Sequence, residues 1–194
     1  MPVNALHSVA RTLAAVLASM LVVAPAGTAS AQAAPGGIVN MPNLHLPDWD
    51  VDEQEQSTIQ KREILKAYKK GVEDLQEGHC RSAVNKFEFV LDFIENDPTV
   101  YYAAATAARC VRSFRSATGF YESTIEFDPE RWEAYRYLGV SYLALGDVEA
   151  ASDALAELDL ARIECEKSCA PDLESAYASL RKAVETAQNI VAPQ

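Results

Sequence analysis

Residues that usually carry catalysis or metal binding are scarce in this chain of 194 residues. It has three histidines, and only His45 and His79 lie beyond residue 31. The G-x-S-x-G, P-loop, H-E-x-x-H and C-x-x-C motifs are all absent. His79 adjoins Cys80, but adjacent residues on a helix point in different directions and make a poor metal or Cys–His pair. The sequence therefore predicts no catalytic residue, no metal ligand, no cofactor and no enzyme.

Positive charge is also in short supply. The chain has 17 Lys and Arg against 28 Asp and Glu, a net charge of −11. A nucleic-acid binder needs a basic stripe, and docking on an anionic membrane needs basic clusters, so the composition argues against both. One local exception is expected to be a solvated helix face, with a site for an acidic partner as the alternative: Lys61, Arg62, Lys66, Lys69 and Lys70.

No apolar run in the sequence is long enough to cross a bilayer, which takes about 20 residues. The longest, Leu13 to Ala24, follows Arg11 and precedes the small-residue site Ala29-Ser30-Ala31. This order is typical of a secretory signal peptide over residues 1–31. We therefore expect an exported protein that begins near Gln32 and is not inserted in the membrane after cleavage. In a Gram-negative source it would be periplasmic, and otherwise secreted.

Residues 32–57 show no helical period. Pro35, Gly36 and Gly37 are followed by further prolines and an acidic run, a composition typical of a flexible linker. Apolar residues such as Leu44 and Trp49 are interspersed. We expect a tether, and the alternative is an arm that docks in a groove of this protein or of a partner.

A period of 34 residues organises the chain from the late sixties to about residue 160. Small residues recur at this interval, as do large apolar ones, without insertions. A fixed period of this length is typical of repeated helix–turn–helix units. Three rows show it: Ala83, Ala117 and Ala151; Phe87, Tyr121 and Leu155; Gly71, Ala105 and Gly139.

The last copy of the period resembles the tetratricopeptide repeat (TPR) family. It has the family's aromatic, Leu-Gly, Tyr, turn Gly, Ala and apolar positions at Tyr135, Leu138, Gly139, Tyr142, Gly146, Ala151 and Leu158. The earlier copies depart from the pattern at Lys70, Asp74 and Ala108. This resemblance covers roughly half the chain, and the C-x-x-x-C of Cys165 and Cys169 that follows the array resembles a feature of small exported bacterial TPR proteins.

The resemblance implies an all-α solenoid of about three repeats, over residues 58–97, 98–131 and 132–164. A cysteine loop and a capping helix would follow over residues 165–190. Sequence signals predict a first helix that is capped by Ser57 and runs to about Gln76. The helices predicted after it are His79–Glu95, Thr99–Arg112, Phe114–Phe127, one from Arg131 that stops at Gly146, one capped by Asp147 that runs to Arg162, and Pro171–Asn189.

The resemblance also implies a binding scaffold that holds a protein or peptide in a concave groove. The groove residues expected from the repeat register are Tyr68, Tyr102, Arg109, Arg136 and Leu143. The subfamily that clamps a terminal carboxylate has Lys and Asn here, so that specificity is not carried over. The function expected is an exported adaptor for an envelope protein. The alternatives are a thiol-redox protein using Cys165 and Cys169, and a module that self-associates.

Four cysteines remain to be placed. In the repeat register, Cys80 opens the second helix of the first copy and Cys110 lies near the end of the next, antiparallel helix. A bridge between them is therefore geometrically reasonable, and Cys165 and Cys169 are four residues apart at a helix end. We expect these two pairs to be structural disulfides.

Overall fold

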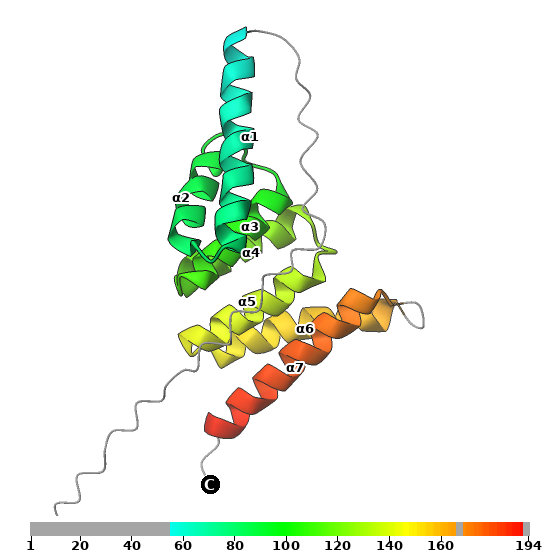
Figure 1. Ribbon diagram of the computed structural model, residues 1–194. Coiled ribbons are helices and arrows are strands. Elements are labelled where there is room, and N and C mark those ends of the chain that lie inside the picture. The colour runs from blue at the N-terminus through cyan, green and yellow to red at the C-terminus, as the bar shows by residue number, and fades with distance from the viewer. Residues whose placement is uncertain (1–54, 166–168, 192–194) are drawn as a thin grey trace, which may run out of the picture. The chain divides into compact units, whose positions relative to one another are not determined.

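The computed structural model describes residues 55–165 and 169–191, and every regular element in these two ranges is an α-helix (Figure 1). The predicted all-α fold is therefore confirmed. Residues 1–31 and nearly all of the predicted linker lie outside the described residues. No described helix is long and apolar enough to span a membrane. The helices are α1 (Glu55–Gln76), α2 (Cys80–Leu91), α3 (Pro98–Cys110), α4 (Phe114–Phe127), α5 (Trp132–Leu145), α6 (Val148–Glu164) and α7 (Pro171–Val191).

Local capping signals account for several helix ends. The side chain of Asp97 accepts hydrogen bonds from the backbone N–H groups of Thr99 and Val100, and Pro98 occupies the first turn of α3. Gly146 ends α5 with a φ of 83°, a left-handed conformation that suits glycine. Asp147 then caps α6 by accepting from the Ala150 N–H at 3.0 Å. Gly146 and Asp147 end α5 and begin α6 as the sequence predicted.

The largest differences from the predicted helix ends are at the start of α1 and the end of α2. The cap predicted at Ser57 is wrong because α1 already includes Glu55, and Glu55 and Gln56 are good helix formers that continue it. The second helix ends at Leu91 instead of Glu95. Beyond it, Ile94 packs against the core and the Glu95 carbonyl accepts a hydrogen bond from the Tyr101 hydroxyl. These tertiary contacts replace the last turn of helix.

Successive helices pack on one another, and the buried residues form three clusters. The first lies between α1, α2 and α3, the second between α3, α4 and α5, and the third between α5, α6 and α7. Ala83, Ala117 and Ala151, one full period apart, are each completely buried. The 34-residue period is thus the spacing at which equivalent side chains enter successive cores.

Glycine at two positions of the period allows helices to approach closely. A Cβ atom on Gly71 would lie 2.9 Å from the Phe87 ring, and one on Gly139 would lie 2.6 Å from Leu180 Cδ1. Both distances are too short for a real Cβ contact. The small residues of this row therefore make room for the large side chains of a neighbouring helix.

Both expected cysteine pairs lie at disulfide distance. Cys80 and Cys110 connect the start of α2 to the end of α3, with a Cα–Cα distance of 5.8 Å. Cys165 and Cys169 have a Cα–Cα distance of 5.1 Å and pack against the third cluster, near the start of α7. The pairing is the one expected from the repeat register.

Candidate functional site

Aromatic rings and guanidinium groups from three helices meet in a tyrosine–arginine cluster. It consists of Tyr102 and Arg109 on α3, Tyr121 on α4, and Arg136 and Tyr137 on α5. The three rings have centroids 5.9 to 6.4 Å apart. The guanidinium carbons of Arg109 and Arg136 lie 4.3 and 4.0 Å from the Tyr137 ring centre. Arginine held over a tyrosine ring is a cation–π contact, and it orients both guanidinium groups.

The charges of this cluster are only partly compensated. Glu133 accepts a hydrogen bond from the Tyr102 hydroxyl at 3.2 Å and pairs with Arg136 at 3.7 Å. Burial raises the pKa of both Tyr102 and Tyr121, and the charge of Arg109 opposes the rise at Tyr121. These phenols therefore stay neutral at ordinary pH. The Arg109 Nε atom is buried and has no hydrogen-bond partner among the described residues.

The predicted groove residues differ in how deeply they are buried. Tyr68 is 0% exposed and packs edge-to-face on Phe87, so the prediction that it faces a partner is wrong. Gly71, three residues later on α1, leaves space for the Phe87 ring against which Tyr68 packs. Tyr102 is only 7% exposed. Leu143 is half-buried against the third core.

Arg109 and Arg136 remain half-buried, with Arg136 25% exposed. The charged end of Arg136 stays partly hydrated, where a tyrosine of similar length would enter the core. Sequence reasoning missed Tyr137, although it contacts both arginines. The repeat gave no signal for it, because the residue one period earlier is Ala103, which is fully buried in the first core.

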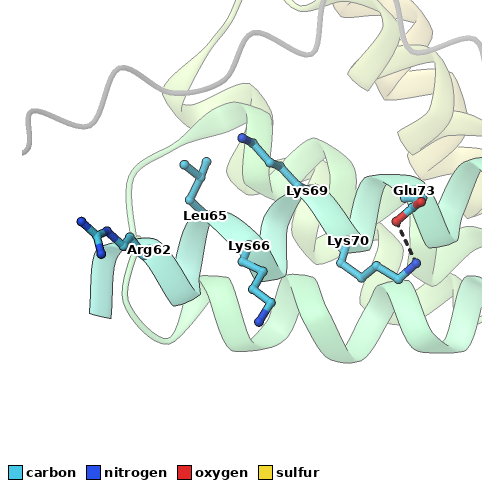
Figure 2. A pocket seen from close by; sticks show the side chains of 6 residues that line it. All are labelled: Arg62, Leu65, Lys66, Lys69, Lys70 and Glu73. Carbon is cyan, nitrogen blue, oxygen red and sulfur yellow. Dashed lines mark hydrogen bonds and ion pairs between the residues drawn. The ribbon is translucent and has the colours of Figure 1, made fainter. Parts of the chain in front are cut away.

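A second surface is the basic face of α1, formed by Arg62, Leu65, Lys66, Lys69, Lys70 and Glu73. Figure 2 shows Leu65 and Lys69 on one flank of this face and Lys66 and Lys70 on the other. Lys70 pairs with Glu73 at 2.7 Å, and Lys66 lies 3.9 Å from Glu63. Arg62 and Lys69 make no ion pair with any described residue. A half-buried leucine is thus surrounded by four cations.

A third surface, the acidic hollow, has a volume of about 430 Å³ between α4, α5 and α6. Its floor is largely apolar, and four exposed carboxylates stand at its rim, none of them ion-paired with a described residue. Hydrogen bonding to Glu122, with burial, raises the pKa of Tyr142 to about 12. The floor residues are Ile125, Tyr135, Leu138, Tyr142, Ala150 and Ala154, and the rim residues are Glu122, Glu126, Asp153 and Glu157.

Asp74 explains one departure from the TPR pattern. Its buried carboxylate lies 2.8 Å from the Lys86 ammonium on α2 and 3.6 Å from Lys70, so it joins the two helices of the first copy. Asp74, Glu77 and His79 bring three possible metal-binding atoms within 4.8 Å of one another. The adjacent Lys86 already compensates the Asp74 charge, which makes the group a poor cation site.

The Asp74 pair should make stability depend on acid. The hydrogen bond from Lys86, followed by that from Ser82, lowers the pKa of Asp74 from 3.8 to about 2. Because the folded-state pKa is below the unfolded one, the stabilisation is full above the unfolded value of 3.8 and is lost as pH falls to about 2. In thermal melts, Asp74→Asn should be less stable than the wild type near neutral pH, and the gap should close across that interval.

Asp92→Asn is the matched control for this measurement. Asp92 is exposed at the end of α2 and makes no ion pair with a described residue. Its variant should follow the wild-type pH curve. A gap between Asp74→Asn and the wild type that stays constant down to pH about 2 would contradict the role given to Asp74.

Comparisons with known proteins agree with this architecture. No protein-family model and no curated protein matches the chain. Among solved structures, PcrH in complex with the chaperone binding region of PopD is 15% identical, with a TM-score of 0.57, over 73% of this chain and 99% of that one. The Sgt2 TPR domain from Aspergillus fumigatus is 18% identical, with a TM-score of 0.53, over 68% and 85%.

The TPR2B domain of yeast Sti1, in its pHsp70 complex, is 22% identical, with a TM-score of 0.51, over 63% of this chain and 98% of that domain. At such identities the likeness concerns the fold. The chain therefore has the fold of a tetratricopeptide repeat domain, as its 34-residue period predicted.

Proposed function

We propose that this protein is an exported, non-enzymatic scaffold that binds a segment of an envelope protein at the tyrosine–arginine cluster. The observation that carries the proposal is the position of the Arg109 guanidinium. This group is half-buried against Tyr137, and its buried Nε donor has no partner among the described residues. An unsatisfied buried donor costs about 1–3 kcal/mol. A carboxylate or carbonyl oxygen of a partner would bind the accessible part of this half-buried guanidinium.

Protein binding is also what the similar structures support. PcrH was solved with the chaperone binding region of PopD, and the Sti1 domain in a pHsp70 complex. Tyrosine and arginine, the residue types gathered in the cluster, are enriched at binding hot spots. Export is supported by Arg11, the apolar run after it and the Ala29-Ser30-Ala31 site.

The experiment is site-specific photocrosslinking in the native host. A photoreactive phenylalanine replaces Val140, which is half-buried one turn beyond Arg136 on α5. The matched position is Arg115, an exposed residue on α4 outside the cluster. We expect an envelope protein to be crosslinked at position 140 and not at position 115. Mass spectrometry of this protein, isolated from the same host, should give an amino terminus at or near Gln32.

Purified partner then allows a quantitative test. Arg109→Ala should weaken its binding by about 30-fold, the effect of a hot-spot residue worth about 2 kcal/mol. Arg115→Ala should bind as the wild type does, and both variants should keep their helix content. Unchanged binding by Arg109→Ala would place the partner site elsewhere. A chain that still begins at Met1 in the soluble fraction would contradict export.

A further inference from the structure

The acidic hollow has four exposed rim carboxylates that make no ion pair with a described residue, and Glu122 among them accepts a hydrogen bond from Tyr142. Its floor includes Leu138 and the side chains of Tyr135 and Tyr142, all from α5. On α4, Glu122 and Glu126 are one helical turn apart at the rim, and on α6 so are Asp153 and Glu157. Carboxylates in such pairs repel each other, and cations that arrive between them relieve the repulsion. The hollow therefore selects an apolar side chain flanked by positive charges.

The basic face of α1 has the complementary arrangement. Leu65 is half-buried on one flank of this face together with Lys69, and Lys66 and Lys70 are one helical turn apart on the other flank. Side chains four residues apart on a helix have Cβ atoms about 5–6 Å apart, the same spacing as each acidic pair at the rim of the hollow. The charge and spacing of the Lys66–Lys70 pair therefore match those of an acidic pair at the rim.

The two surfaces belong to different parts of the same chain. Among the described helices, α1 packs mainly on α2 and, to a smaller extent, on α3, while the hollow is built by α4, α5 and α6. Residues 61–70 also hold the densest group of cations in an otherwise acidic protein. A ligand with the required chemistry is thus present in every copy of the chain.

We propose that a second copy of this chain binds the acidic hollow through the basic face of its α1. Leu65 of one copy then covers the apolar floor of the other, and its four cations face the four rim carboxylates. The contact is heterologous, because each copy contributes a different surface. It does not depend on the tyrosine–arginine cluster, so it is tested separately from the proposed partner binding.

The test uses the chain purified as its host processes it, studied by sedimentation equilibrium at low and high salt. Self-association should weaken by about tenfold or more between about 50 and 500 mM salt, because the contacts lie at an exposed rim. The double variant Arg62→Glu/Lys69→Glu and the double variant Glu126→Lys/Asp153→Lys should each be monomeric. None of these four side chains makes an ion pair with a described residue, so the fold should be retained.

Mixing the two double variants gives the decisive result. The second variant keeps the basic face of α1 and the first keeps the acidic hollow, so these two unaltered surfaces can meet, and the mixture should form a complex although each variant alone does not. The control Arg115→Glu/Lys182→Glu changes the net charge by the same amount as Arg62→Glu/Lys69→Glu, but at exposed positions on α4 and α7. It should associate as the wild type does.

Three outcomes overturn the proposal. One is a wild-type chain that stays monomeric. This outcome overturns the proposal even if the hollow binds a lysine-rich peptide probe. Another is association that survives either double variant. The third is a mixture of the two variants that remains monomeric.

Discussion

Phe87→Ala should lower the free energy of unfolding by about 3–5 kcal/mol, the usual cost of removing a buried aromatic ring. Phe87 is fully buried, its ring packs edge-to-face on Tyr68, and it fills the space left by Gly71. The void cannot close easily, because Tyr68 and Gly71 lie on one rigid helix. Denaturant unfolding followed by circular dichroism measures the loss.

Phe89→Ala is the matched control for this loss. Phe89 lies two residues further along α2, is 40% exposed and touches the equally exposed Phe93. Its removal should cost about 1 kcal/mol or less. Equal losses for the two variants would contradict the packing assigned to the first core.

Cys80→Ser, measured on oxidised protein, should cost about 3–4 kcal/mol, because the Cys80–Cys110 bridge closes a loop over a sequence separation of 30. Cys165→Ser opens a bridge with a separation of only four and should cost about 2 kcal/mol. The melting temperature should therefore fall further for Cys80→Ser. Peptide mapping without reductant should recover the same two pairs.

Other mapping results would change the interpretation of the cysteines. A bond from Cys80 to Cys165 or Cys169 would contradict the repeat register, since a solenoid repeat touches only its neighbours. Four free thiols in exported protein would leave the register intact and remove the stabilisation. If mild reductant opens the Cys165–Cys169 bond alone, the thiol-redox alternative would gain support.

The fold was predictable because the period repeats physical constraints and not just residue types. An alanine recurs at positions 83, 117 and 151, and each of the three is fully buried. Turn residues such as Gly146 and Asp147 act locally, so their effect could be deduced without tertiary structure. The end of α2 could not be deduced in this way, because Ile94 and Glu95 lie beyond the helix, where they contact the core and α3.

The candidate site was less predictable, because a repeat register gives the side of a helix and not the depth of a side chain. Tyr68 and Arg136 share a register position, but the tyrosine enters the core and the guanidinium stays hydrated. The acidic hollow combines residues from three helices, and no sequence period links Glu122 to Asp153. The hollow becomes visible only when α4 and α6 are packed on α5.

The sharing of α3 between two cores has a consequence for local opening of the protein. Val100, Ala103 and Ala107 belong to the first cluster, whereas Tyr102 and Ala105 belong to the second. Exposing the backbone of α3 to hydrogen exchange therefore requires both cores to break, at a free energy close to that of global unfolding. α1 and α7 each contribute buried residues to a single cluster and can open at lower free energy. The array thus combines a slowly exchanging centre with two faster ends, and the proposed self-association through α1 would use one of those ends.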